Sequence, residues 1–164
     1  MRILGIDPGY GIVGYGIIES DGYNLKVIDY GVITTPKEDT LPVRLNIIAD
    51  CLTQIINNYK PDQIAIEELF YFKNQKTIIP VAEARGVIVY ICGKLCENNV
   101  FEYTPLQVKQ ALTGIGRAEK YQIQYMVKTL LGLEKIPKPD DAADALAIAI
   151  THSQINSALN TNRI

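Results

Sequence analysis

Acidic residues stand at the ends of two apolar stretches that are far apart in the sequence. Asp7 closes the stretch RILGID, and Glu67 and Glu68 lie near the end of DQIAIEELF. Short apolar stretches of this kind favour buried strands, and α/β proteins gather their chemistry at the carboxyl ends of such strands. If the two strands are neighbours in a sheet, their carboxylates meet.

Three aspartates lie in an alanine-rich stretch that is otherwise suited to a helix buried in the core. The stretch PKPDDAADALAIAIT, residues 137–151, contains Asp140, Asp141 and Asp144. Asp141 and Asp144 are three residues apart, so both project from one face of a helix. The small side chains allow such a helix to lie close to a sheet and to direct its carboxylates toward the strand ends.

A cluster of four carboxylates requires bound cations. Two carboxylates about 4 Å apart repel each other by roughly 4 kcal/mol at an effective dielectric of 20, so four together would become protonated or move apart. Oxygen-only ligands suit Mg²⁺ or Mn²⁺. A pair of divalent ions would balance the four acids and could stabilise the entering and leaving oxygens of a phosphoryl displacement.

Each acid also has a purely structural interpretation. Asp7 could hold the Pro8-Gly9 turn, the paired glutamates could be a solvated strand end, and the paired aspartates could cap a helix. Asp144 is the hardest to explain in this way, because it stands inside an otherwise apolar helix.

Composition and charge indicate one domain of ordinary size with an uneven distribution of charge. The 164 residues carry a net charge of −2 and are 48% hydrophobic, and a chain of this length can bury a substantial core. Residues 1–68 hold five Lys/Arg against ten Asp/Glu, residues 69–138 hold ten against five, and residues 139–164 hold one against three. An acidic beginning and end therefore flank a basic middle, which suits a protein that gathers cations at one place and polyanions around it.

The three cysteines contain no CxxC pair, so we expect reduced thiols in a cytoplasmic protein. A zinc site made by Cys92, Cys96 and His152 is an alternative, but small buried side chains are the favoured interpretation. We expect no signal peptide, because MRILGIDPG is too short an apolar start, and no membrane span, because no apolar run reaches about 18 residues.

Apolar periodicity and turn signals divide the chain into alternating strands and helices. Asp21-Gly22 is a hairpin signal, and Thr104-Pro105 is typical of a helix start. We expect strands at 2–7, 11–20, 23–35, 62–70 and 100–103, and helices at 41–59, 77–99, 105–113, 118–133 and 141–158. The fourth strand follows a helix, so a parallel pairing is expected. The prediction is one α/β domain over residues 1–157 with a mixed sheet, followed by a polar tail, residues 158–164, that frays.

One motif suggests two nucleotide-binding alternatives. GYGIVG, residues 9–14, matches G-x-G-x-x-G, but a dinucleotide site needs this motif to open a helix, and the residues that follow favour a strand. Sugar kinases and actin-like ATPases also place an aspartate and glycines between two strands, as in GIDPGYGIVGYG. Those ATP-using phosphotransferases need two lobes, and we see neither a second lobe nor a second phosphate loop here.

Five motifs taken together resemble a known family. GIDPG, AIEELF, EARG, FEYTPLQVKQALTGIGRAEK and DDAADALAIAITH occur in the order and at the spacing of the RuvC-type Holliday junction resolvases of bacteria. The resemblance covers residues 1–153, and its two longest motifs are highly specific. It implies a ribonuclease-H-like three-layer fold: a mixed five-stranded sheet, with three antiparallel strands and then parallel strands, and helices on both faces.

The resemblance also implies a site. It assigns catalysis and metal binding to four acids, Asp7, Glu67, Asp141 and Asp144. This selects Glu67 over Glu68, which periodicity leaves undecided, while a minor ligand role for Glu68 or Asp140 stays open. The implied activity is that of a Mg²⁺-dependent endonuclease with two ions per site, for which Mn²⁺ substitutes.

The DNA contacts implied by the resemblance are Phe70, Lys73, Lys76, Lys109, Arg117 and Lys120. In LFYFKNQKT, aromatic rings can stack on unpaired bases while lysines meet phosphates, and the family match makes Phe70 the ring that probes the junction centre. The alternatives are that the aromatic residues belong to the core and that the basic residues are solvated surface.

The implied partners are four-way junction DNA, a second copy of the chain, and the RuvA and RuvB branch-migration proteins. A twofold dimer matches the near twofold symmetry of a junction, so two identical sites can nick opposed strands and leave ligatable 5′-phosphate ends. A catalytically silent DNA-binding relative is the remaining functional alternative.

Overall fold

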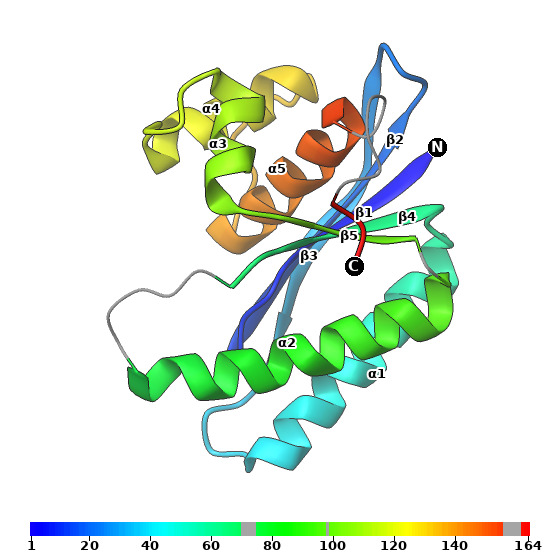
Figure 1. The fold of residues 1–164 in the computed structure, drawn as a ribbon, viewed down its shortest axis with the longest axis vertical. Helices are drawn as coiled ribbons and strands as arrows, with labels where there is room; N and C mark the ends of the chain where they lie inside the picture. Colours follow the sequence, from blue (N-terminus) through cyan, green and yellow to red (C-terminus); the bar gives the residue numbers. More distant parts are fainter. Residues whose placement is uncertain (70–74, 98, 156–161) are drawn as a thin grey trace.

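The computed structural model describes residues 1–69, 75–97, 99–155 and 162–164. It has one five-stranded sheet in the order β3-β2-β1-β4-β5, with α1 and α2 on one face and α3, α4 and α5 on the other (Figure 1). The strands are β1 (Arg2–Asp7), β2 (Ile12–Ser20), β3 (Leu25–Thr34), β4 (Gln63–Glu67) and β5 (Val100–Tyr103), and the helices are α1 (Leu41–Tyr59), α2 (Gln75–Cys96), α3 (Pro105–Thr113), α4 (Lys120–Leu130) and α5 (Asp140–Ile155). The predicted three-layer α/β fold is confirmed.

The sheet combines two kinds of pairing, as the sequence predicted. β1 pairs antiparallel with β2, and β2 with β3, whereas β4 pairs parallel with β1 and β5. The β2–β3 connection is a hairpin in which the Asp21 carboxylate accepts hydrogen bonds from the backbone N–H groups of Tyr23 and Asn24. Because G-x-G-x-x-G leads into β2 and not into a helix, it does not form a dinucleotide-binding turn.

Alternation along the strands gives the sheet two apolar faces. Ile3 and Ala65 pack in the cluster that contains α5, while Leu4 and Ile64 pack in the cluster that contains α1 and α2. Residues two apart on a strand share a face. Asp7 is therefore on the same face as Ile3, and Glu67 on the same face as Ala65, which is the face that α5 covers.

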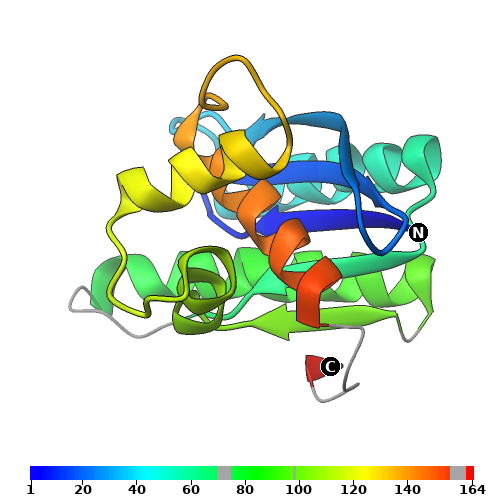
Figure 2. The ribbon, with the colours of Figure 1, turned by 90° about the horizontal axis from the view of Figure 1, so that it is seen from above.

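Glycines let α5 lie directly on the sheet (Figure 2). A Cβ atom added to Gly5 would lie 2.1 Å from the carbonyl oxygen of Ala145, and one added to Gly14 would lie 2.0 Å from that of Asp141. Neither distance is compatible with a side chain, so the close approach of α5 depends on these glycines. The contact at Gly14 fixes the first turn of α5 beside the end of β1, since Gly14 pairs with Asp7.

The element boundaries differ from the predictions at several ends. β4 stops at Glu67 where a strand to residue 70 was expected, and α2 starts at Gln75, so Pro80 lies inside the helix. The start of α3 is as predicted: Thr104 and Gln107 form a capping box with Pro105 after the cap. No helix in the described ranges is long and apolar enough to cross a membrane.

Part of the polar tail has a defined place in the fold. Residues 156–161 lie outside the described residues. Beyond them, Arg163 forms a β-bridge with Phe101, and the N–H of Ile164 donates a 3.0 Å hydrogen bond to the carbonyl of Val100. Residues 162–164 therefore lie along β5, although the sequence suggested a frayed end.

Candidate active site

Two acids lie at the carboxyl ends of neighbouring parallel strands. The β1–β4 register pairs Gly5 with Ala65 and Ile6 with Ile66. The next residues along the two strands are Asp7 and Glu67, and both are half-buried on the α5 face. The sequence-based expectation that these two strand ends adjoin is therefore correct.

The other two predicted acids lie in the first two turns of α5. Asp141 packs over Gly14, next to Asp7, and Asp144 follows one helical turn later. Asp144 and Glu67 line one pocket of about 260 Å³. The structure thus brings Asp7, Glu67, Asp141 and Asp144 to one edge of the sheet.

The electrostatics of this edge indicate carboxylates close enough to repel. Burial raises the pKa of Asp7 to about 8, and the charges of Glu67, Asp144 and Asp141 add to that rise. Burial also raises the pKa of Glu67 to about 7, with a further contribution from Asp144. Burial likewise raises the pKa of Asp144. Burial is thus the main cause of these pKa shifts, and repulsion between neighbouring carboxylates adds to it for Asp7 and Glu67.

Lys120 is a cation at the acid cluster. Its Nζ lies 2.9 Å from Oδ2 of Asp144 and 3.6 Å from Oδ2 of Asp140. Burial disfavours its charge, but its hydrogen bond to Asp144 and the surrounding carboxylates outweigh this, so the pKa of Lys120 lies above its ordinary value. The charge of Lys120 also offsets part of the rise in the pKa of Asp7 and of Glu67. The sequence proposed Lys120 as a phosphate contact and did not anticipate this bond to Asp144.

The remaining predicted residues are placed as follows. Lys109 lines the pocket, and its charge offsets part of the rise in the pKa of Glu67. Arg117 is exposed on the connection between α3 and α4. Lys76 lies in the first turn of α2, and its side chain is outside the described part. Phe70 and Lys73 are outside the described residues.

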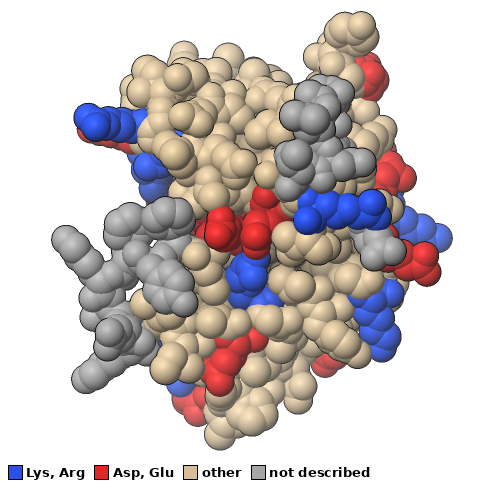
Figure 3. Space-filling view, in the orientation of Figure 1, with Lys and Arg blue, Asp and Glu red and all other residues tan. Residues whose placement is uncertain are grey.

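Asp140 and Glu68, which stand next to the four acids in sequence, make contacts of their own. The carboxylate of Asp140 pairs with Lys138 at 2.6 Å, which together with Lys120 lowers its pKa. Glu68 follows β4, and its N–H donates a 2.9 Å hydrogen bond to the carbonyl of Tyr103. In the space-filling view, acidic and basic side chains lie next to one another near the centre of one face (Figure 3).

The donor set at this edge fits a hard divalent cation. All four acids offer carboxylate oxygens, which Mg²⁺ and Mn²⁺ prefer. The pKa of Asp7 is raised first by burial and then by the neighbouring carboxylates, and a bound cation would favour its ionised form. Within the described part of the chain, no group of three or more His, Cys, Asp or Glu side chains is already drawn together as a closed metal cage. The ion pair between Lys120 and Asp144 occupies one of the acids in this arrangement.

Histidine and cysteine lie in the core, away from this edge. Nδ1 of His152 is 2.7 Å from the hydroxyl of Tyr103, and Nε2 is 2.8 Å from Oε1 of Gln63. Cys92 is fully buried and Cys96 half-buried on α2. The sequence analysis favoured small buried side chains over a zinc site for these cysteines, and Cys92 is buried as expected.

Sequence reasoning missed one charged pair beside the site. Arg85 of the motif EARG forms an ion pair with Glu102 and hydrogen-bonds the backbone carbonyl of Glu67. The signal was present, since EARG was among the matched motifs, but its partner on β5 is not visible from sequence spacing.

Comparisons with known proteins identify relatives over nearly the whole chain. The family model described as crossover junction endodeoxyribonuclease RuvC matches residues 3–152. The chain is 55% identical to the RuvC protein of Fusobacterium nucleatum over 99% of this chain and 86% of that protein. It is 58% identical to the RuvC protein of Petrotoga mobilis over 93% of each. The structure of T. thermophilus RuvC in complex with Holliday junction substrate superimposes with a TM-score of 0.94, at 30% identity, covering 100% of this chain and 99% of that one.

Proposed function

The chain belongs to the RuvC family of crossover junction endodeoxyribonucleases, and we propose that it resolves four-way DNA junctions with the acid cluster at the ends of β1 and β4. The observation that carries the proposal is the convergence of Asp7 and Glu67 with Asp141 and Asp144 on one face of the sheet. Four carboxylates from three separate parts of the chain have no comparable structural purpose, because their mutual repulsion opposes folding.

Asp7, Glu67, Asp141 and Asp144 would hold the metal, with two Mg²⁺ per site and Mn²⁺ as a substitute. Bound divalent cations would supply the positive charge that activates a water and stabilises the oxygens of phosphodiester hydrolysis. The protein holds the carboxylates in place by seating α5 on glycines, so that Asp141 lies against Gly14. The expected products are nicked duplexes with ligatable 5′-phosphate ends.

Basic residues around the pocket would bind the phosphate backbone. Lys109 and Lys120 line the pocket. Arg117, three residues before Lys120, is exposed. The family resemblance adds Phe70, Lys73 and Lys76, with Phe70 as the ring that probes the junction centre. Phosphate contacts release counterions, so binding should weaken as the salt concentration rises.

A homodimer would supply the second active site. The outer face of α2 exposes apolar side chains, with Ile79 at 65% and Tyr90 at 63% of their full exposure. Gly86 and Gly93 lie exposed on the same helix and leave open space beside it. An exposed apolar stripe of this kind supports pairing with a second copy. RuvA and RuvB would be the other protein partners, in the cytoplasm.

The test is cleavage of a synthetic four-way junction with each strand labelled in turn. We expect paired, symmetric nicks with Mg²⁺ or Mn²⁺, none with EDTA, and products that DNA ligase reseals. Linear duplex of the same sequence should not be cut. Intact junction binding without cleavage in either metal would identify a silent DNA-binding relative instead, and ATP hydrolysis in the absence of nicking would point to the phosphotransferase alternative.

A further inference from the structure

The ion pair of Arg85 and Glu102 lies on the face of the sheet opposite to the acid cluster. Arg85 projects from α2 toward the carboxyl ends of β4 and β5, where its guanidinium forms an ion pair with the Glu102 carboxylate. Its Nε also donates a 3.4 Å hydrogen bond to the backbone carbonyl of Glu67. Arg85 therefore contacts the backbone of a residue whose carboxylate belongs to the proposed active site.

The strand register explains why Arg85 approaches from this side. Ile66 pairs with Glu102, and Glu67 pairs with Tyr103. Tyr103 packs in the cluster that contains α5, so its neighbour Glu102 faces the α2 layer. Glu102 is thus a carboxylate close to the end of β4 on the far side of the sheet, and Arg85 compensates its charge.

The same interaction restrains the point at which β4 ends. The peptide unit between Glu67 and Glu68 is held at both polar ends: its N–H donates to the carbonyl of Tyr103, and its carbonyl accepts from Arg85. Residues 68 and 69, which follow β4, belong to no strand or helix. When the peptide plane at the end of a strand is fixed, the side chain of the residue before it can take fewer directions. Here that residue is Glu67.

We propose that Arg85, anchored by Glu102, is a positioning residue that fixes Glu67 for strand cleavage. The proposal rests on the role proposed above for Glu67. The side chains of Arg85 and Glu102 are 19% and 28% exposed, so removing either partner leaves a largely buried charge unpaired and costs some stability. The loss of cleavage and of Mn²⁺ affinity is therefore measured in variants that remain folded.

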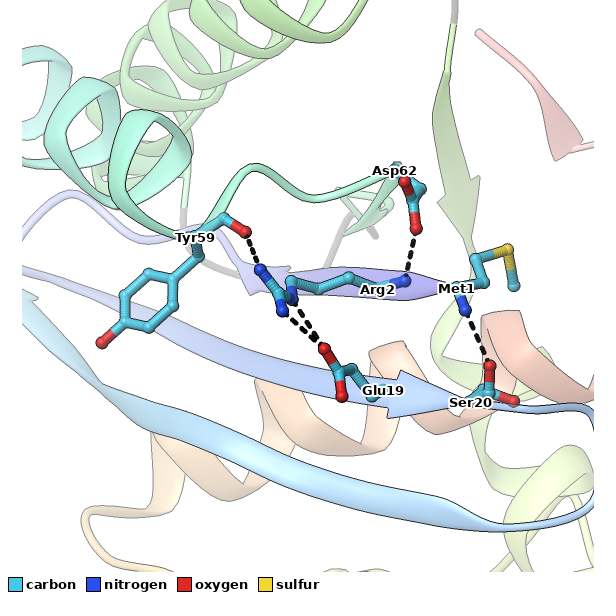
Figure 4. Close-up of polar contacts among 6 residues, drawn as sticks. All are labelled: Met1, Arg2, Glu19, Ser20, Tyr59 and Asp62. Atoms are coloured by element: carbon cyan, nitrogen blue, oxygen red, sulfur yellow. Dashed lines mark hydrogen bonds and ion pairs between the residues drawn. The ribbon is translucent and has the colours of Figure 1, made fainter.

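The chain offers a matched control at the other end of the sheet (Figure 4). Arg2 pairs with Glu19 at 2.5 Å and donates a 2.5 Å hydrogen bond to the backbone carbonyl of Tyr59. This is the same combination of one carboxylate and one carbonyl, but it lies at the start of β1 whereas Asp7 lies at its end. Arg2→Met therefore measures the loss of such a pair at the opposite end of β1 from Asp7.

The experiment compares Arg85→Met, Arg85→Lys, Glu102→Gln, Glu67→Gln and Arg2→Met in the full chain. Three quantities are measured: single-turnover cleavage of a four-way junction at saturating protein, junction affinity by gel shift in EDTA, and Mn²⁺ affinity by calorimetry without DNA. We expect Arg85→Met and Glu102→Gln to lower the cleavage rate and Mn²⁺ affinity roughly 10-fold or more, the effect typical of residues that support metal ligands. Junction affinity should stay within about threefold, Arg85→Lys should restore part of the loss, and Arg2→Met should match wild type.

Two failures can be told apart. Near wild-type cleavage by Glu67→Gln would overturn the proposed role of Glu67 itself. An inactive Glu67→Gln beside an Arg85→Met that retains wild-type cleavage and Mn²⁺ affinity would overturn only the positioning role. If Arg85→Met does not fold, Glu102→Gln decides: wild-type cleavage and Mn²⁺ affinity in that variant would reject the proposal.

Discussion

The ammonium of Lys120 lies 2.9 Å from the Oδ2 atom of Asp144, so a cation from α4 pairs directly with an acid of α5. The charge of Lys120 also offsets part of the rise in the pKa of Asp7 and of Glu67. The protein thus carries part of its own counter-charge at the edge where the four acids meet. This pairing shows that the cluster can be partly compensated before any other cation arrives.

Replacing Lys120 should make the site more dependent on divalent metal. In Lys120→Met the carboxylates lose this counter-charge, so added Mg²⁺ should raise the melting temperature more than it does in the wild type. Cleavage should fall, because the residue is also a proposed phosphate contact. The control is Lys128→Met, two turns along the same helix. An Mg²⁺-induced rise no greater than that of the wild type would contradict this view of Lys120.

Asp7→Asn should abolish cleavage and stabilise the metal-free protein at alkaline pH. The pKa of Asp7 is about 8 in the folded chain against 3.8 as its ordinary value. Between these values the folded state binds more protons than the unfolded state, so stability falls as pH rises. Removing the charge should add about 1–3 kcal/mol at pH 8, and much less near pH 4.

Urea unfolding in EDTA at both pH values measures this difference, and gel shift checks that junction binding persists. An Asp7→Asn variant that is less stable than the wild type at pH 8 would argue against an unfavourable buried charge at Asp7. Retention of near-normal Mg²⁺-dependent nicking would argue against the catalytic role.

Gly14→Ala should damage the site by displacing α5. The added Cβ would lie 2.0 Å from the carbonyl of Asp141, so the helix must move away from β2. We expect a loss of about 1–3 kcal/mol in unfolding free energy, together with a large loss of cleavage. Gly93→Ala on α2 meets nothing within 4 Å and should instead gain about 0.5–1 kcal/mol. Equal stabilities for the two variants would mean that the α5 contact is not tight.

Tyr90→Glu should separate the proposed dimer. A charge on the exposed apolar face of α2 would oppose its burial against a second copy. Sedimentation at micromolar protein concentration should report monomers, and paired nicking should become single nicking. Tyr23→Glu is the control, because Tyr23 is 97% exposed on the β2–β3 hairpin. A Tyr90→Glu protein that sediments like the wild type would place the dimer contact elsewhere.

The sequence predicted the strands and the meeting of their acids because both depend on local patterns. The apolar run of RILGID stops at Asp7, so the position of Asp7 at a strand end followed directly. The stretch DQIAIEELF placed Glu67 and Glu68 near a strand end, but the strand was expected to reach residue 70 and stops at Glu67. The choice between Glu67 and Glu68 did not follow from periodicity, because it depends on which face α5 covers. That face is set by Gly5 and Gly14, whose significance appears only with the helix in place.

Long-range pairings account for what the sequence did not reveal. The bond between Lys120 and Asp144 depends on how α4 docks on α5, through a connection without regular helix or strand structure. The pair of Arg85 and Glu102 joins a helix to a strand on the side away from the acids. Neither relationship has a fixed sequence spacing, so neither could be read from the motifs.

The segment formed by residues 162–164 covers part of the outer side of β5. β5 is an edge strand, and its free backbone groups would otherwise offer a template for a strand of another molecule. Ile164 and Arg163 occupy part of that template by pairing with Val100 and Phe101. Backbone groups of β5 that are paired in this way cannot pair with a strand of another molecule. Any association of the chain with a second copy would therefore use other surfaces.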